Sequence, residues 1–205
     1  MSREFDKNYW ETHWSGSHQG APFPPAHPAL EEEVAALHPG TALDAGAGAG
    51  NEASWLAAHG WEVTAVDISA HAAARAATRQ QSEGRAGQVA WIEADLTVWA
   101  PEQQFDLVTT FYAHPEITQH AFYERISQWV APGGTLLIVG HYEGHGPADG
   151  ETHPHNAVTT PELIRAHFSP SQWAVSTAEV RSRVVSMEGG PALKLRDVVA
   201  RLGRI

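Results

Sequence analysis

The sequence contains no cysteine in its 205 residues. This excludes disulfide bonds, thiolate metal sites and a cysteine nucleophile, and it fits a reducing cytosol. Long apolar runs are missing too, because no stretch approaches the roughly 20 residues that a membrane-spanning helix needs. The opening residues, MSREFDKNYWETHW, lack the apolar core of a signal peptide. We therefore expect a cytoplasmic protein.

Positive charge is also scarce. The chain has 13 Lys and Arg against 24 Asp and Glu, which gives a formal net charge of -11 at pH 7. Because nucleic-acid backbones are bound through clustered Lys and Arg, this balance argues against nucleic acid as the main partner. The overall composition, 42% hydrophobic and 18% charged, is typical of a folded globular protein. The length favours one domain over two.

Strand and helix patterns alternate along most of the chain. Residues 1–39 form an aromatic and proline-rich arm followed by a short amphipathic helix, and residues 40–205 form the core of a single domain. The core pattern predicts strands at 41–46, 61–69, 88–96, 105–113 and 135–142, helices at 51–60, 70–84, 118–134 and 161–168, and a terminal hairpin from 173–184 and 192–202. Strands separated by helices indicate an α/β fold with a mostly parallel sheet covered on both faces.

A glycine-rich turn, TALDAGAGAGNEA, joins the first strand to the next helix at residues 41–53. Such a turn lets a ligand approach the backbone where any side chain would collide. Asp67 ends the second strand, where an acidic residue in such folds holds both ribose hydroxyls. Together they indicate a nucleoside-containing ligand at the strand ends. A structural alternative is that a glycine here only permits close packing of helix on strand.

The spacing of this turn fits two kinds of nucleoside site. Gly48, Gly50 and Ala53 match the dinucleotide pattern G-x-G-x-x-A, whereas Asp44, Gly46, Gly48 and Gly50 match acid-x-G-x-G-x-G. Asp44 favours the second pattern, because a carboxylate is repelled by a pyrophosphate and suits a ligand with an ammonium and a sulfonium. A phosphate-binding P-loop is excluded, since no G-K-[ST] follows.

Four segments, LDAGAGAGNEASWLAAHGWEVTAVDIS, VAWIEADLTVWAP, FDLVTTFYAHPE and VAPGGTLLIVGHY, make the chain similar to the class I S-adenosylmethionine-dependent methyltransferases. It resembles in particular the small bacterial stand-alone enzymes related to the tellurite-resistance and thiopurine methyltransferase groups. The resemblance runs from about residue 40 to residue 142. It implies a Rossmann-like three-layer sandwich with a seven-stranded sheet whose last strand is antiparallel, S-adenosylmethionine as cofactor and S-adenosylhomocysteine as product.

The resemblance also implies roles for single residues. Asp67 would bind the ribose hydroxyls, Ile68 would pack against the adenine, and Phe111 would face the cofactor near the reacting methyl group. Asp95 and Leu96 would contact the adenine amino group and ring. The methionine end of the cofactor would be lined by Asp44, Ala45, Gly46, Gly48 and Gly50.

His114 is the candidate general base, because it follows the fourth strand at the sheet edge where such folds bind ligands. The alternative is that it only shapes the pocket or caps a turn before Pro115. Other residues suited to the acceptor pocket or, for the arm, to the cofactor are Tyr9, Trp10, Trp14, Tyr112, His141 and Tyr142. For the three from the arm, core packing is an equally good explanation.

The 13 histidines raise the possibility of a metal site. His141, His145, His153 and His155 could supply nitrogen ligands, but no acidic ligand set accompanies them and no HExxH occurs, so we expect no metal.

We predict a methyltransferase that acts on a small molecule, since the chain has no added domain and no basic face. An NAD(P)-dependent oxidoreductase is one alternative, disfavoured by Asp44 and by the lack of a Tyr-x-x-x-Lys pair. A non-catalytic protein that binds S-adenosylmethionine as a sensor or subunit is the other.

Overall fold

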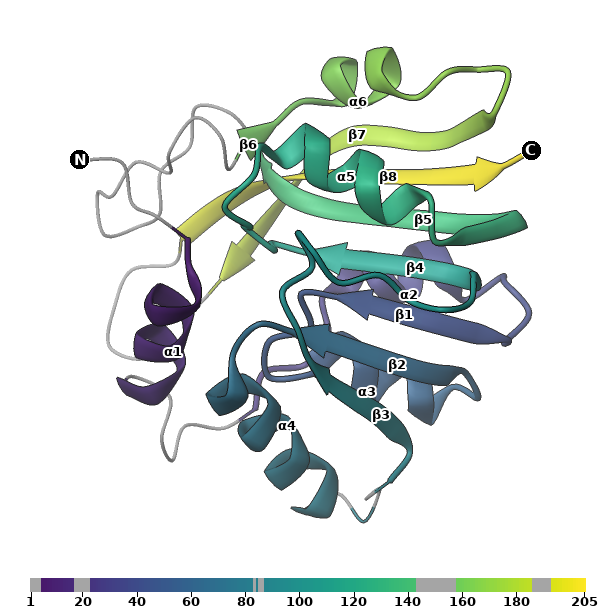
Figure 1. Cartoon of the computed structure of the whole chain (residues 1–205). Coiled ribbons are helices and arrows are strands. Elements are labelled where there is room, and N and C mark those ends of the chain that lie inside the picture. Colours follow the sequence, from purple (N-terminus) through teal and green to yellow (C-terminus); the bar gives the residue numbers. More distant parts are fainter. Residues whose placement is uncertain (1–4, 17–22, 83, 85–86, 143–157, 186–192) are drawn as a thin grey trace.

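The computed structural model describes residues 5–16, 23–82, 84, 87–142, 158–185 and 193–205. A single sheet runs through it, with strand order β3-β2-β1-β4-β5-β8-β7 and a short strand β6 paired to β5 (Figure 1). The strands are β1 (Thr41–Ala45), β2 (Glu62–Asp67), β3 (Val89–Glu93), β4 (Phe105–Phe111), β5 (Val130–Tyr142), β6 (Val158–Thr159), β7 (Trp173–Val185) and β8 (Leu193–Arg204).

Strand direction in the sheet follows the prediction. The pairs β1–β2, β2–β3, β1–β4 and β4–β5 are all parallel, whereas β8 runs antiparallel to both of its neighbours, β5 and β7. The α/β fold and the antiparallel last strand are therefore confirmed, with the two-residue β6 as an addition. The strand order reverses between β1 and β4, and ligands of open α/β sheets bind where the order reverses, at the carboxyl ends of the strands.

Helices cover the sheet on both faces and give three layers. The helices are α1 (Lys7–Gly16), α2 (Pro28–Val34), α3 (Asn51–Ala58), α4 (Ala70–Ser82), α5 (Gln119–Ser127) and α6 (Pro161–His167). Leu30 of α2 and Leu56 of α3 are buried in one core cluster, and α5 and α6 contribute to a second cluster through Phe122 and Ile164. Buried between these layers, β5 has an unbroken apolar run, as expected for a strand covered on both sides.

Two helices end well before their predicted ends. The helix expected over 118–134 stops at Ser127, because Val130 already pairs with Phe105 of β4 and Pro132 lacks the N–H that a helix needs. The short amphipathic helix expected within residues 1–39 stops at Val34, where a tight turn with a Leu37 N–H to Val34 carbonyl bond follows.

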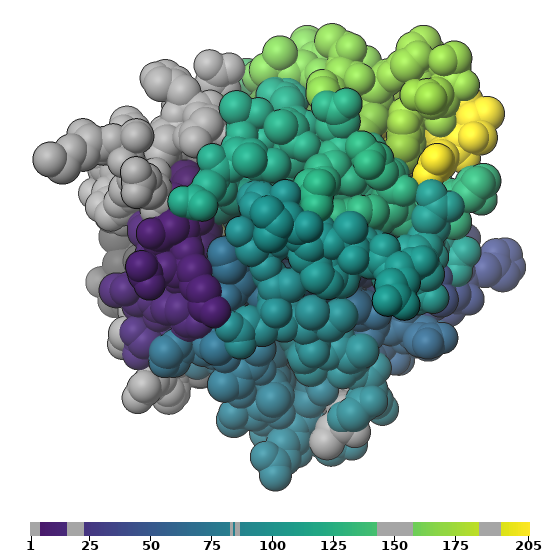
Figure 2. All heavy atoms as spheres, in the orientation of Figure 1, coloured from purple at the N-terminus to yellow at the C-terminus, as the bar shows by residue number. Residues whose placement is uncertain are grey.

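Helix α1 is the one regular element described in the amino-terminal arm. In Figure 1 the arrows of β1, β2 and β4 point toward the side of the molecule where α1 lies, so α1 stands at the carboxyl ends of these strands. Figure 2 shows its atoms packed on that side as part of the surface. Among the described residues, no helix is long and apolar enough to cross a membrane.

Candidate functional site

The glycine-rich turn lies at the carboxyl end of β1. Gly46, Gly48 and Gly50 have φ angles of 80°, 50° and 75°, a left-handed backbone that favours glycine. A Cβ atom at Gly46 would lie 2.4 Å from the Ala113 Cβ, and one at Gly50 would lie 2.3 Å from the Trp91 ring. Close packing within the chain therefore accounts for part of the requirement for glycine, which was the alternative to a ligand given for this turn.

Asp44 is the most enclosed acidic group of the turn. It is 1% exposed, and its Oδ1 accepts a hydrogen bond of 2.9 Å from the Thr109 hydroxyl. Its Oδ2 is buried and has no hydrogen bond to any of the described residues. Burial and, secondarily, the charge of Glu52 raise the pKa of Asp44 to about 8. Ala45 is fully buried beside it at the end of β1.

Two further carboxyl groups interact with Asp44 and complete what we call the acidic cluster: Asp44, Glu52 and Asp67. Asp67 accepts hydrogen bonds from the backbone N–H groups of Gly48 (2.8 Å) and Ser69 (2.9 Å). Glu52 accepts one from the His27 N–H (3.0 Å). Burial raises the pKa of both groups. Like charges at close range disfavour one another, so this cluster suits a cationic ligand.

Within the part of the chain that the structure describes, no group of His, Asp or Glu side chains has an arrangement that could hold a metal ion. Of the histidines considered as ligands, His145, His153 and His155 lie outside the described residues.

The residues after β2 and β3 lie next to each other. The Ala94 N–H donates to the Asp67 carbonyl, which brings the turn with Asp95 beside the end of β2. Asp95 closes this turn by accepting from the N–H and hydroxyl of Thr97. Ile68 is half-buried directly after Asp67.

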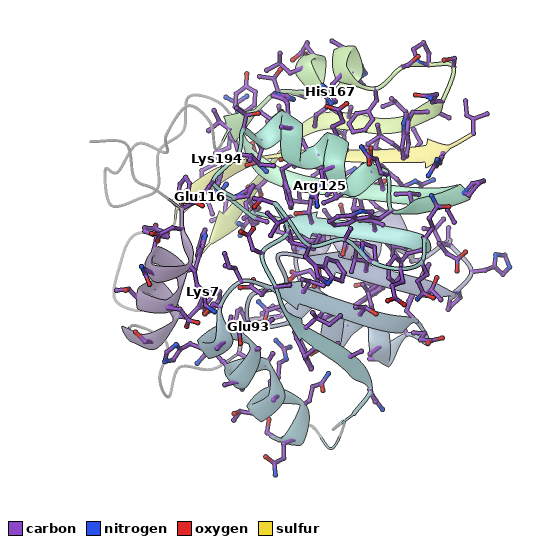
Figure 3. All side chains as sticks on the ribbon, viewed as in Figure 1. Lys7, Glu93, Glu116, Arg125, His167 and Lys194 are labelled. Carbon is purple, nitrogen blue, oxygen red and sulfur yellow. The ribbon has the colours of Figure 1, made fainter. Side chains whose placement is uncertain are left out.

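Leu96 and Phe111 are both buried at the edges of this region. The Leu96 side chain belongs to the core under α5, and its carbonyl accepts from Arg125, whose position Figure 3 shows. Phe111 ends β4 with its ring centroid 5.8 Å from that of His27.

Helix α1 is attached to the site by polar contacts that sequence reasoning missed. Glu11 accepts from the Ser69 hydroxyl and from the N–H groups of Ala70 and His71, and thus caps the start of α4 just after Asp67. Burial alone would raise the pKa of Glu11. A hydrogen bond from the His71 ring, together with the three bonds just named, lowers it to about 2. Figure 3 shows Lys7 beside Glu93, with which it forms an ion pair.

Trp14 of α1 lies directly above the glycine turn. A Cβ at Gly48 would meet its ring at 2.9 Å. Trp14, one of the aromatic residues proposed from the arm, therefore contacts the turn.

Other aromatic residues of the arm lie near His114. We call Phe5, Tyr9, Trp10, Tyr112, His114 and His141 the aromatic cluster. Ring centroids of His114 lie 5.4 Å from Phe5, 6.4 Å from Trp10 and 5.2 Å from His141. Tyr9 contacts both Phe5 and Trp10, and Tyr112 lies 4.6 Å from His141. The Trp10 Nε1–H donates to the His114 carbonyl (3.2 Å). The structure thus brings together most of the residues predicted for the acceptor side.

Tyr142 lies apart from this cluster. Its side chain packs against the core under α5 and α6, with Arg196 4.4 Å above its ring, whereas Tyr112 packs against the core on the other face of the sheet. Alternate residues of a strand point to opposite faces, which separates Tyr142 from its neighbour His141.

A polar network behind Tyr112 was also missed. Tyr112 has a φ of 52°, and its hydroxyl lies 3.2 Å from His27 Nε2 and accepts from Arg183 (3.3 Å). Asp197 pairs with Arg183 at 2.7 Å and lies 3.3 Å from His27. Burial alone would raise the pKa of Asp197, but hydrogen bonds from His27, Tyr112 and Arg183 lower it to about 2. The signal for this network in the sequence was Asp197, the single acidic residue in the strand segment LRDVVARL.

The sequence is similar to those of known methyltransferases. Residues 42–134 match the family model described as a methyltransferase domain. The ribosomal RNA small subunit methyltransferase C of Alcanivorax borkumensis is 33% identical over 112 residues, 51% of this chain and 33% of the relative. An uncharacterized methyltransferase of Mycobacterium tuberculosis is 38% identical over 114 residues, 54% of this chain and 55% of the relative. The chain thus spans about half or less of the length of these curated relatives.

The fold is shared over nearly the whole chain with solved structures. The N-methyltransferase NodS from Bradyrhizobium japonicum, solved in complex with S-adenosyl-L-homocysteine, has a TM-score of 0.70 and 15% identity and covers 97% of each chain.

Proposed function

We propose that this chain is a class I S-adenosylmethionine-dependent methyltransferase and that it transfers a methyl group from this cofactor to a small molecule. The match of residues 42–134 to a methyltransferase domain model supports this proposal. One observation carries the cofactor assignment. Asp44 is buried with an oxygen that has no hydrogen bond among the described residues, inside a cluster of three carboxyl groups. Such a cluster is stabilised by a ligand that carries positive charge.

The residues present fit S-adenosylmethionine. Its ammonium and sulfonium would satisfy Asp44, and the turn of Gly46, Gly48 and Gly50 would hold the methionine end. Asp67, at the carboxyl end of β2, would bind the ribose hydroxyls, with Ile68, Asp95 and Leu96 toward the adenine and Phe111 toward the methyl group. When bound, this cofactor supplies a methyl group on a positively charged sulfur. The chain's contribution is alignment and exclusion of water.

The acceptor would lie against the aromatic cluster. His114 is our candidate general base, which takes the proton that an acceptor hydroxyl or amine gives up. Trp10, Tyr112 and His141 would contact the acceptor. Helix α1 already closes over this side through Trp10 and Trp14, which favours a small acceptor over a macromolecule. The net charge of -11 further disfavours RNA, although one relative is named as a ribosomal RNA methyltransferase.

The cofactor assignment is tested by titration calorimetry of the protein with S-adenosylmethionine, S-adenosylhomocysteine and NADH. We expect heat from the first two compounds alone. Heat from NADH alone would contradict the proposal and favour an oxidoreductase. Cofactor binding without methylation of any member of a broad panel of phenols, amines, thiols and RNA would instead favour a non-catalytic binding protein.

The assignment of the base is tested by His114→Ala. We expect the dissociation constant of the cofactor to stay within about two-fold, while turnover of an acceptor that must lose a proton falls by roughly 10²–10⁴-fold, the usual contribution of general base catalysis. Unchanged turnover would remove His114 from the mechanism.

A further inference from the structure

His114 is held by a second buried side chain, Gln119. The two residues are 8% and 3% exposed, and His114 Nδ1 lies 3.4 Å from Gln119 Oε1. An amide oxygen only accepts hydrogen bonds, so this contact requires a hydrogen on Nδ1. The orientation of the Gln119 amide therefore decides which nitrogen of His114 carries the proton.

The surroundings of Gln119 fix that orientation. Its Nε2 donates to the Ala113 carbonyl at 2.9 Å. Turning the amide over would place Oε1 against this carbonyl, so that two acceptors would face each other. Tyr123 lies one turn further along α5. The amide nitrogen thus binds the Ala113 carbonyl, and the amide oxygen is left for His114.

The elements that carry these groups leave little room for movement. Gln119 begins α5 directly after the N-cap Thr118, whose side chain accepts from the Ala121 N–H. Tyr123 is 2% exposed under β5, where a Cβ at Gly140 would lie 2.9 Å from its hydroxyl. On the other side of His114, the Trp10 indole holds the His114 carbonyl.

We propose that Gln119 is a positioning residue that fixes neutral His114 in the Nδ1–H tautomer, so that Nε2 is its basic nitrogen. The inference rests on the proposed role of His114 as a base. The proton leaves the acceptor and moves to Nε2, and the ring becomes positively charged. Nδ1–H continues to donate to Gln119 Oε1, which stabilises this charge. In the opposite tautomer, two acceptors, Gln119 Oε1 and His114 Nδ1, would face each other. Nε2 would already carry a proton and could not take one from the acceptor substrate.

The tautomer is measured directly by long-range ¹H–¹⁵N correlation NMR of the protein labelled with ¹⁵N-histidine, at a pH where His114 is neutral. His114→Ala identifies the signals of this ring. We expect the pattern of an Nδ1–H imidazole. The pattern of an Nε2–H imidazole in the unsubstituted protein would overturn the proposal, whatever the activity.

Two variants of α5 separate positioning from packing. Gln119→Leu removes the acceptor, so the Nε2–H form should become populated and turnover should fall at least ten-fold, with cofactor affinity within about two-fold. Tyr123→Phe is the matched control in the same buried layer: Gln119 keeps its bond to Ala113, so the Nδ1–H form should persist. An Nδ1–H signal that survives in Gln119→Leu would contradict the proposal.

Because the spectra need no turnover, a correct tautomer in a protein that methylates nothing would refute only the proposed function.

Discussion

Asp44 makes the ligand-free protein sensitive to pH. Its pKa in the folded protein, about 8, lies above the ordinary value of 3.8. The folded state therefore binds more protons than the unfolded state between these values, and this carboxyl group lowers the free energy of unfolding as the pH rises from about 4 to 8.

We accordingly predict opposite effects of Asp44→Asn on stability and binding. Without ligand, the variant should be more resistant to urea than the unsubstituted protein, by about 1–3 kcal/mol at pH 8 and by less at pH 5. Affinity for S-adenosylmethionine should fall by roughly ten-fold or more, the effect of a lost charged hydrogen bond. Urea unfolding at both pH values and calorimetry test this. A stability difference that does not change with pH would contradict the assignment of the titration to Asp44.

Gly48 is expected to tolerate alanine poorly for a reason beyond its backbone angle. A left-handed alanine costs about 1–2 kcal/mol anywhere, but here its Cβ would also press on Trp14 at 2.9 Å. Gly48→Ala should therefore displace α1 and weaken cofactor binding at least ten-fold. Gly133→Ala is the matched control, since its φ is 79° and nothing lies within 4 Å of a Cβ there. Equal binding by the two variants would mean that the Trp14 contact is unimportant for binding.

Asp44 and Asp67 could be identified from the sequence because each lies near the end of a predicted strand, Asp44 at the start of the glycine-rich motif. Asp67 ends β2 and Asp44 lies one residue before the end of β1, and the parallel register of β1 on β2 fixes where these ends lie. The polar partners of Tyr112 could not be predicted from strand ends. His27 and Asp197 are 170 positions apart and meet only through the pairing of β8 with β5. The roles assigned to the site residues stay predictions.

At the scale of elements, Glu11 joins α1 to α4. Its pKa of about 2 lies below the ordinary value of 4.5, so its contribution to stability is complete above pH 4.5 and is lost as the pH falls toward 2. We predict that Glu11→Ala speeds hydrogen exchange of the α1 amides about five-fold at neutral pH, as the loss of a cap worth about 1 kcal/mol implies.

Glu93→Ala is the control for this prediction. It removes the exposed ion pair with Lys7 on the same helix, and such surface pairs contribute little to stability. We expect little change in exchange for this variant. A larger effect for Glu93→Ala than for Glu11→Ala would mean that the cap on α4 does not hold α1.

Element boundaries show where local sequence patterns are insufficient. The residues after Ser127 continue an apolar pattern that suits a helix, but pairing with β4 draws Val130 into the sheet. In the arm, the aromatic residues gave no decision between core packing and ligand contact, because a side chain that packs in the core also lies against the candidate base. Phe5 is 6% exposed and also packs on His114.

For the whole molecule, we predict that cofactor binding raises the melting temperature. Ligand at 100 times its dissociation constant adds about 2.7 kcal/mol, and for a chain of this size each kcal/mol corresponds to about 2–4 °C. Asp67→Ala should reduce this rise at the same ligand concentration, because it removes the proposed ribose contact. Asp106→Ala is the control, since that carboxylate binds Thr41 at the opposite end of β1. A full rise in Asp67→Ala would place the ribose elsewhere.

The position of β8 has a consequence for how the protein is made. It lies between β5 and β7 although it follows both in the chain, and Val198, Val199 and Leu202 within it are fully buried. On the ribosome, β7 emerges before the strand that will join it to the sheet. Until residues 193–204 have left the exit tunnel, the nascent chain exposes the free edge of β5 and an unpaired β7. Such edges invite pairing with other chains, so this interval is when a chaperone would matter most.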